Sequence, residues 1–108
     1  RSMISVGKGA IFFTGATASL KGFAHSSVFA MGKFALRGLT QSLYRELSPL
    51  GIHVAHFVID GVVKKSNLTK NSNDFTSEAI AKTFMAILNQ PKQAWSHEIE
   101  LRPNTENF

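Results

Sequence analysis

Two short apolar runs separated by one long helical period constrain the fold of this chain more than any other feature. Residues 10–16 and 52–59 are apolar runs of strand length, which is typical of strands buried on both faces of a parallel sheet. Residues 28–48 between them have a helical period that ends at Pro49 and Gly51. The apolar seam of this predicted helix comprises Leu36, Leu39, Leu43, Leu47 and Leu50. This order predicts a right-handed crossover between two parallel strands.

The second half of the chain adds one more helix and one more strand. Residues 61–75 are polar and indicate a loop, and residues 77–89 have an apolar face typical of a helix, with Thr76 or Ser77 as its cap. Residues 96–101 alternate between polar and apolar side chains, which favours a shorter strand. The sequence therefore predicts an α/β fold in three layers, with a three-stranded parallel sheet in the order strand, helix, strand, helix, strand.

Composition excludes several classes of protein. The net charge is +5, but the lysines and arginines are scattered and no nucleic-acid motif accompanies them, so we expect no nucleic-acid partner. No segment has the ~20 apolar residues that span a bilayer, and no leader precedes the first strand, so we expect no membrane partner. Because cysteine is absent, disulfides and thiolate metal sites are excluded, and we expect a cytoplasmic protein.

The four histidines do not predict a metal site. His53 and His56 are three residues apart on one predicted strand and so point to opposite faces of the sheet. His25 and His97 have no partner at a ligand-like spacing. We expect all four to be solvent-facing or hydrogen-bonded.

Phe29 and Lys33 lie one helical turn apart and therefore share a face of the predicted helix. A tyrosine in place of Phe29 would form a proton-transfer pair with the lysine, because an ammonium lowers the pKa of a nearby phenol. Phe29 has no oxygen for this chemistry. The pair has the form of a Tyr-x-x-x-Lys motif that has lost its tyrosine.

The segments around this pair resemble the short-chain dehydrogenase/reductase family. Residues 9–22, GAIFFTGATASLKG, resemble the family's fifth strand and the loop that carries its catalytic serine. Residues 33–39, KFALRGL, and residues 45–54, RELSPLGIHV, resemble the helix and strand that follow. Residues 60–63, DGVV, stand where the family has Pro-Gly-x-Val, and residues 96–103 resemble its last strand. The resemblance implies that residues 1–108 form one partial domain, the C-terminal part of a Rossmann-like, doubly wound sheet.

The resemblance also implies a set of catalytic positions, most of them altered. Lys33 is a remnant of the family's catalytic group, Phe29 occupies the tyrosine position and Ala16 occupies the serine position. An ordinary surface lysine of the helix is an equal alternative for Lys33. Thr17 and Ser19 are nearby hydroxyls, either of which could replace the serine. The alternative for both hydroxyls is a bond to the local backbone that caps the turn.

The cofactor that the resemblance implies is NAD or NADP. Lys33, Asp60, Gly61 and Val63 occupy the family's cofactor-binding positions, although a structural role for Asp60 in the turn is an equal alternative. The family's T-G-x-x-x-G-x-G phosphate-binding turn is absent from the sequence. We therefore expect that this chain alone does not bind the cofactor tightly.

These observations favour two functions over a third, an enzyme complete in this chain, which the absence of the phosphate-binding turn disfavours. The chain is either a fragment of an NAD(P)-dependent oxidoreductase, acting on a small alcohol or carbonyl in a full-length context, or a catalytically inactive module that serves binding or oligomerisation. The family resemblance implies a homo-oligomer. A strand edge at residues 10–16 without a neighbour would also favour self-association.

Overall fold

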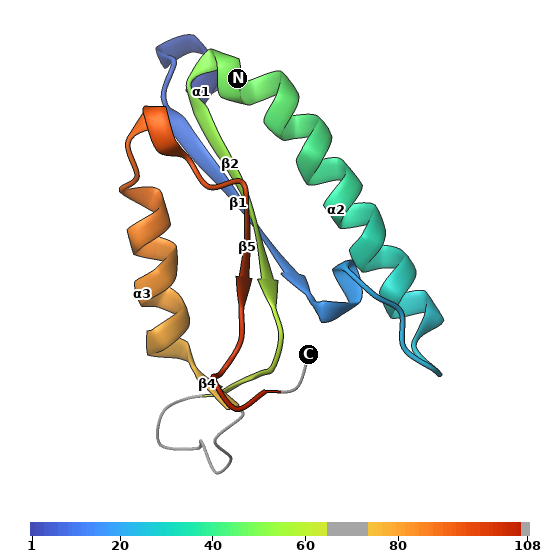
Figure 1. Ribbon diagram of the computed structural model, residues 1–108. Helices are drawn as coiled ribbons and strands as arrows, with labels where there is room; N and C mark the ends of the chain where they lie inside the picture. Colours follow the sequence, from blue (N-terminus) through green and yellow to red (C-terminus); the bar gives the residue numbers. More distant parts are fainter. Residues whose placement is uncertain (65–73, 107–108) are drawn as a thin grey trace.

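A computed structural model describes residues 1–64 and 74–106. Its centre is a parallel sheet of three strands, β1 (Gly9–Ala16), β2 (Ile52–Ile59) and β5 (Glu98–Leu101), in the order β1-β2-β5 (Figure 1). Gly9 of β1 pairs with Ile52 of β2, and the register continues to the ends of both strands. The predicted three-stranded parallel sheet is confirmed.

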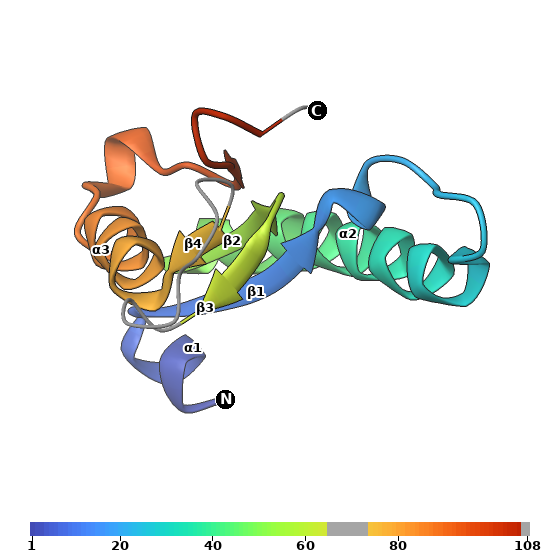
Figure 2. The same cartoon turned by 90° about the horizontal axis from the view of Figure 1, so that it is seen from below.

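Two helices cover opposite faces of this sheet (Figures 1 and 2). Helix α2 (Ser27–Leu47) packs on one face, and helix α3 (Ser77–Leu88) lies on the other, which confirms the three predicted layers. A short helix, α1 (Ser2–Val6), precedes the first strand. The connections include three 3₁₀ turns: η1 (Thr17–Ser19), η2 (Ser48–Leu50) and η4 (Lys92–Ala94).

Local sequence signals set the ends of these helices. Thr76 Oγ1 accepts a hydrogen bond of 3.2 Å from the backbone N–H of Ala79, so Thr76 is the N-cap of α3, as predicted. The chain leaves η2 through Gly51 at φ 88°, where a Cβ would also overlap the carbonyl oxygen of Gly7. Glycine is therefore required at the turn that leads into β2.

The predicted loop over residues 61–75 is wrong at both ends. Strand β3 (Val62–Lys64) and strand β4 (Asp74–Thr76) form a second, two-stranded parallel sheet, which needs long-range pairing that the polar sequence does not indicate. Residues 65–73 of this prediction lie outside the described residues. The last strand also begins two residues later than predicted, because Ser96 and His97 precede the paired segment.

The face of the sheet under α3 is apolar. Its buried core is Ala55, Phe57 and Ile87, with Phe12, Phe84, Ile99 and Leu101 packed against it. The rings of Phe57 and Phe84 stack with centroids 3.8 Å apart, and Phe12 meets Phe57 edge-on. This face holds the main hydrophobic core of the described chain.

The face of the sheet under α2 carries the buried His56 among the apolar Ile52, Val54 and Val58, and α2 does not meet it with the expected seam. The buried residues of α2 are Ala30 and Thr40, while Leu39 of the leucine seam is 49% exposed. Arg37 of α2 reaches the sheet and contacts Glu98 of β5. Helix α2 contacts the sheet with the side that carries Ala30, Arg37 and Thr40. The leucine seam therefore lies beside this contact and not within it.

Among the described residues, no helix is both long enough and apolar enough to cross a membrane.

Candidate functional site

Three side chains that follow the three main strands meet at the carboxyl edge of the sheet. Thr17 follows β1, Asp60 follows β2 and Arg102 follows β5. Thr17 Oγ1 donates a hydrogen bond to Asp60 Oδ1, and Arg102 Nε donates to Asp60 Oδ2 at 3.1 Å. Asp60 is only 7% exposed, so its carboxylate is committed to these partners. The three residues act as a clamp on the strand ends, at the edge where open α/β sheets hold ligands.

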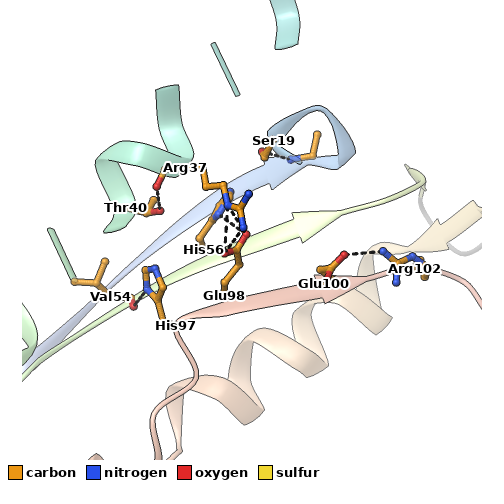
Figure 3. Close-up of polar contacts among 10 residues, drawn as sticks. Ser19, Arg37, Thr40, Val54, His56, His97, Glu98, Glu100 and Arg102 are labelled. Carbon is orange, nitrogen blue, oxygen red and sulfur yellow. Dashed lines mark hydrogen bonds and ion pairs between the residues drawn. The ribbon is translucent and has the colours of Figure 1, made fainter. Parts of the chain in front are cut away.

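Arg102 also binds a second carboxylate. Its Nη2 donates to Glu100 Oε1 at 2.9 Å (Figure 3). The hydrogen bonds to Glu100 and to Asp60 raise the pKa of Arg102, so the guanidinium stays charged. Sequence analysis did not single out Arg102, because its pairing with a residue 42 positions earlier requires the tertiary fold.

Lys33 and Phe29 share one face of α2, as their spacing predicts. Lys33 Nζ lies 5.6 Å from the centroid of the Phe29 ring and donates to the backbone oxygen of Thr14 at 3.4 Å. Phe29 is 54% exposed. The two side chains line an open pocket of about 410 Å³ together with Val28, Gly32 and Leu36.

The predicted serine position carries no reactive group in the structure. Ala16 contributes a methyl group, and its backbone N–H donates to Ser19 Oγ at 3.2 Å. Ser19 is fully buried, so it caps the turn as the structural alternative proposed. Thr17 differs from that alternative because its hydroxyl bonds to the side chain of Asp60 rather than to the local backbone.

The remaining cofactor positions lie after β2. Gly61 adopts φ 156°, which favours glycine, and Val63 is 46% exposed on β3. Asp60 turns inward to the clamp and away from the capping role in the turn that was the alternative. Of these four positions, Gly61 and Val63 are exposed, Lys33 is half-buried and Asp60 is buried in the clamp.

A second polar cluster, which sequence analysis missed, lies beneath α2. His56 of β2 pairs in register with Glu98 of β5, and its Nδ1 lies 3.7 Å from Glu98 Oε1 (Figure 3). Arg37 Nη2 donates to Glu98 Oε2 at 3.3 Å. His56 is fully buried, and neither ring nitrogen has a hydrogen-bond partner among the described residues. Burial disfavours the imidazolium and lowers the pKa of His56 below 6.5, although the Glu98 carboxylate opposes this shift.

The histidine predictions are partly confirmed. His53 and His56 lie on opposite faces of the sheet: His53 contacts Phe12 on the α3 face, and His56 faces Arg37 of α2. Both are buried. His53 is hydrogen-bonded to the backbone oxygen of Ser96, which is one of the two predicted alternatives, whereas His56 is neither solvent-facing nor hydrogen-bonded among the described residues. In the described part of the chain, no group of three or more His, Cys, Asp or Glu side chains could hold a metal ion.

Comparisons with known proteins agree with the fold. The family model for short chain dehydrogenase matches residues 1–77. A solved short-chain dehydrogenase from Rhodopseudomonas palustris is 42% identical, with a TM-score of 0.76, and the match covers 94% of this chain and 41% of that chain. The comparison with curated proteins found no match.

Two more distant structures share the fold. Serine dehydrogenase from Escherichia coli is 19% identical with a TM-score of 0.80, and the match covers 98% of this chain and 45% of that chain. An alcohol dehydrogenase from the archaeon Thermococcus sibiricus, complexed with 5-hydroxy-NADP, is 20% identical with a TM-score of 0.82. The match covers 98% of this chain and 46% of that chain. The chain thus spans less than half the length of each of these solved relatives.

Proposed function

Because this chain belongs to the short-chain dehydrogenase family, we propose that it is the C-terminal half of a cytoplasmic, NAD(P)-dependent oxidoreductase with an atypical active site. The substrate class is a small alcohol or carbonyl compound. Support for the cofactor comes from relatives: serine dehydrogenase has been solved with NADP+, and the Thermococcus sibiricus alcohol dehydrogenase with 5-hydroxy-NADP.

The observation that carries the proposal is the placement of Lys33. The backbone oxygen of Thr14 near the end of β1 accepts from Lys33 Nζ at 3.4 Å, which aims the ammonium at the carboxyl edge of the sheet. An ammonium has three donors, so Lys33 has two more for the hydroxyls of a ribose. This residue therefore fits the nicotinamide end of the cofactor.

The cofactor, when bound, supplies hydride transfer, and the chain's own residues would position it. Lys33 would hold the ribose, and the backbone at Gly61 would border the nicotinamide at the same edge. Phe29 has no proton to give, so it would form an apolar wall beside Lys33. The sequence has no glycine-rich turn for the pyrophosphate, so a phosphate-binding segment must come from outside this chain.

A chimaera tests the proposal directly. We would join the N-terminal half of the Rhodopseudomonas palustris relative to Arg1 of this chain and titrate NADH and NADPH. We expect micromolar binding, and Lys33→Met should weaken it by about tenfold or more, because a charge-assisted hydrogen bond is lost. Lys82→Met on the exposed surface of α3 is the matched control and should leave the affinity unchanged. A folded chimaera that binds neither cofactor would refute the proposal.

A specific observation favours the second function, a catalytically inactive module for oligomerisation. Helix α2 exposes several large apolar side chains: Val28, Phe29, Met31, Phe34 and Leu39. A monomer rarely leaves so many on one helix, and such patches mark protein contacts. We propose a second copy of this chain as the partner, which supports a homo-oligomer under either function.

A further inference from the structure

A pocket at the opposite end of the sheet from Lys33 has no role in the proposed function. It has a volume of about 260 Å³ and lies at the amino ends of the strands, where α1 and η4 also lie (Figure 1). Its walls come from β1, β2 and the segment that follows α3. The lining residues that the argument uses are Lys8, His53, Leu88, Lys92 and Trp95. Seven residue steps of about 3.3 Å separate Gly9 from Ala16, so roughly 23 Å lies between the two ends of β1.

One wall of this pocket contains a stacked pair of rings. The rings of His53 and Trp95 are stacked at an interplanar angle of 3°, with centroids 4.6 Å apart. Both rings are held in place: His53 Nε2 donates to the backbone oxygen of Ser96 at 2.8 Å, and Trp95 Nε1 donates to the backbone oxygen of Gln90 at 3.2 Å. Because the two rings stack, each covers one face of the other, and His53 is only 2% exposed. The apolar surface left to a ligand is therefore that of Trp95 with Leu88 beside it, which suits a planar ring.

The charge of the pocket is uncompensated. Lys8 and Lys92 both line it, and no Asp or Glu does. Neither lysine forms an ion pair with a carboxylate among the described residues. Lys92 Nζ lies 3.4 Å from the position that a Cβ on Gly51 would occupy, so the ammonium stands over the pocket wall rather than away from it. Two cations beside an apolar wall favour a ligand with one planar ring and one negative group.

We propose that this pocket binds a small aromatic carboxylate, with the ring against Trp95 and Leu88 and the carboxylate between Lys8 and Lys92. The volume is below the range for drug-sized ligands, which favours a single ring. The site is independent of the cofactor, since it lies at the other end of the strands. A test of this pocket is therefore independent of the oxidoreductase proposal.

Trp95 is the only tryptophan of the chain, so its indole N–H gives a single resonance that reports on this pocket. We would titrate the ¹⁵N-labelled chain with 4-methylbenzoate and follow the single indole N–H resonance. We expect a saturable shift with a Kd of about 1 mM or below, a reasonable affinity for so small a ligand. The neutral analogue 4-methylbenzamide should bind about tenfold or more weakly, because it lacks the charge.

A pair of double variants separates the pocket lysines from net charge. Lys8→Gln with Lys92→Gln should weaken 4-methylbenzoate binding by about tenfold or more. Lys82→Gln with Arg45→Gln removes the same charge from exposed positions outside the pocket and should bind like the wild-type chain. The absence of a saturable shift for the wild-type chain, equal affinities for acid and amide, or equal losses in both double variants would each overturn the proposal.

Discussion

His56 Nε2 occupies the space that a side chain on Gly15 would need. A Cβ built on Gly15 would overlap His56 Nε2 and lie 2.8 Å from Ser19 Oγ. Both Ser19 and His56 are fully buried and have no room to move aside. The glycine before the predicted serine position is therefore fixed by a histidine 41 residues later in the sequence.

This relationship predicts that Gly15→Ala lowers the free energy of unfolding by about 1–3 kcal/mol, because the added methyl overpacks a buried site. Gly38→Ala is the matched control, since a Cβ there meets nothing within 4 Å and the residue lies inside α2. The control should raise the free energy of unfolding by about 0.5–1 kcal/mol. Urea unfolding measures both, and equal effects of the two substitutions would contradict the steric account.

The lowered pKa of His56 predicts a loss of stability in acid. The folded state binds the His56 proton less readily than the unfolded state, whose pKa is near 6.5. The free energy of unfolding should therefore be highest above this pH and should fall as the pH drops through 6.5, by at most about 1.4 kcal/mol per pH unit. The charged groups that act on His56 are Glu98, Arg37, His97 and Lys33.

His56→Gln is the variant that isolates this effect. It removes the titrating group, so its free energy of unfolding should depend less on pH between about 5 and 7. Urea unfolding at several pH values gives both curves. A wild-type chain whose stability is flat through this range would show that His56 does not carry the effect.

The clamp at the carboxyl edge predicts that Asp60→Asn destabilises the fold. The substitution removes the charge that Arg102 binds and that Thr17 donates to, and it should lower the free energy of unfolding by about 1–3 kcal/mol. Glu100→Gln, at a largely exposed partner of the same arginine, should change it by about 0.5 kcal/mol or less. Thermal and urea unfolding compare the two, and a neutral Asp60→Asn would mean that the clamp contributes no stability.

Restoring the family's catalytic pair should not create an enzyme from this chain alone. Phe29→Tyr with Ala16→Ser supplies the hydroxyls but no phosphate-binding turn, so calorimetry should show no tight NAD or NADP binding and no turnover should appear. In the chimaera the same double variant should raise the rate by roughly 10²–10⁴, the usual worth of general acid catalysis. A low-micromolar Kd for the isolated chain would contradict the first expectation.

The isolated chain should self-associate. The outer edge of β1 has no neighbouring strand among the described residues, and α2 exposes Phe29, Met31 and Leu39. Light scattering should therefore give a mass above 11.8 kDa that rises with concentration. Met31→Glu with Leu39→Lys should shift the mass toward the monomer while keeping the helix. A monomer mass that does not depend on concentration would rule out this expectation.

The sequence by itself determined the order of the three main strands and the two long helices, and the helical face shared by Phe29 and Lys33. Periodicity, strand-length apolar runs and helix caps are local properties, and the described structure matches them within about two residues at each end. The resemblance around Lys33 likewise identified the family, since its motifs are continuous in the sequence.

Only the tertiary structure decided which side chains meet across the sheet. Thr17, Asp60 and Arg102 come together because parallel strands end at one edge, and His56 faces Glu98 because β2 and β5 pair in one particular register. The side of α2 that packs on the sheet was also not evident from the sequence, because the spacing of the leucines indicated a different side of the helix. Pairing and burial depend on residues some 40 positions apart, which no local pattern in one sequence encodes.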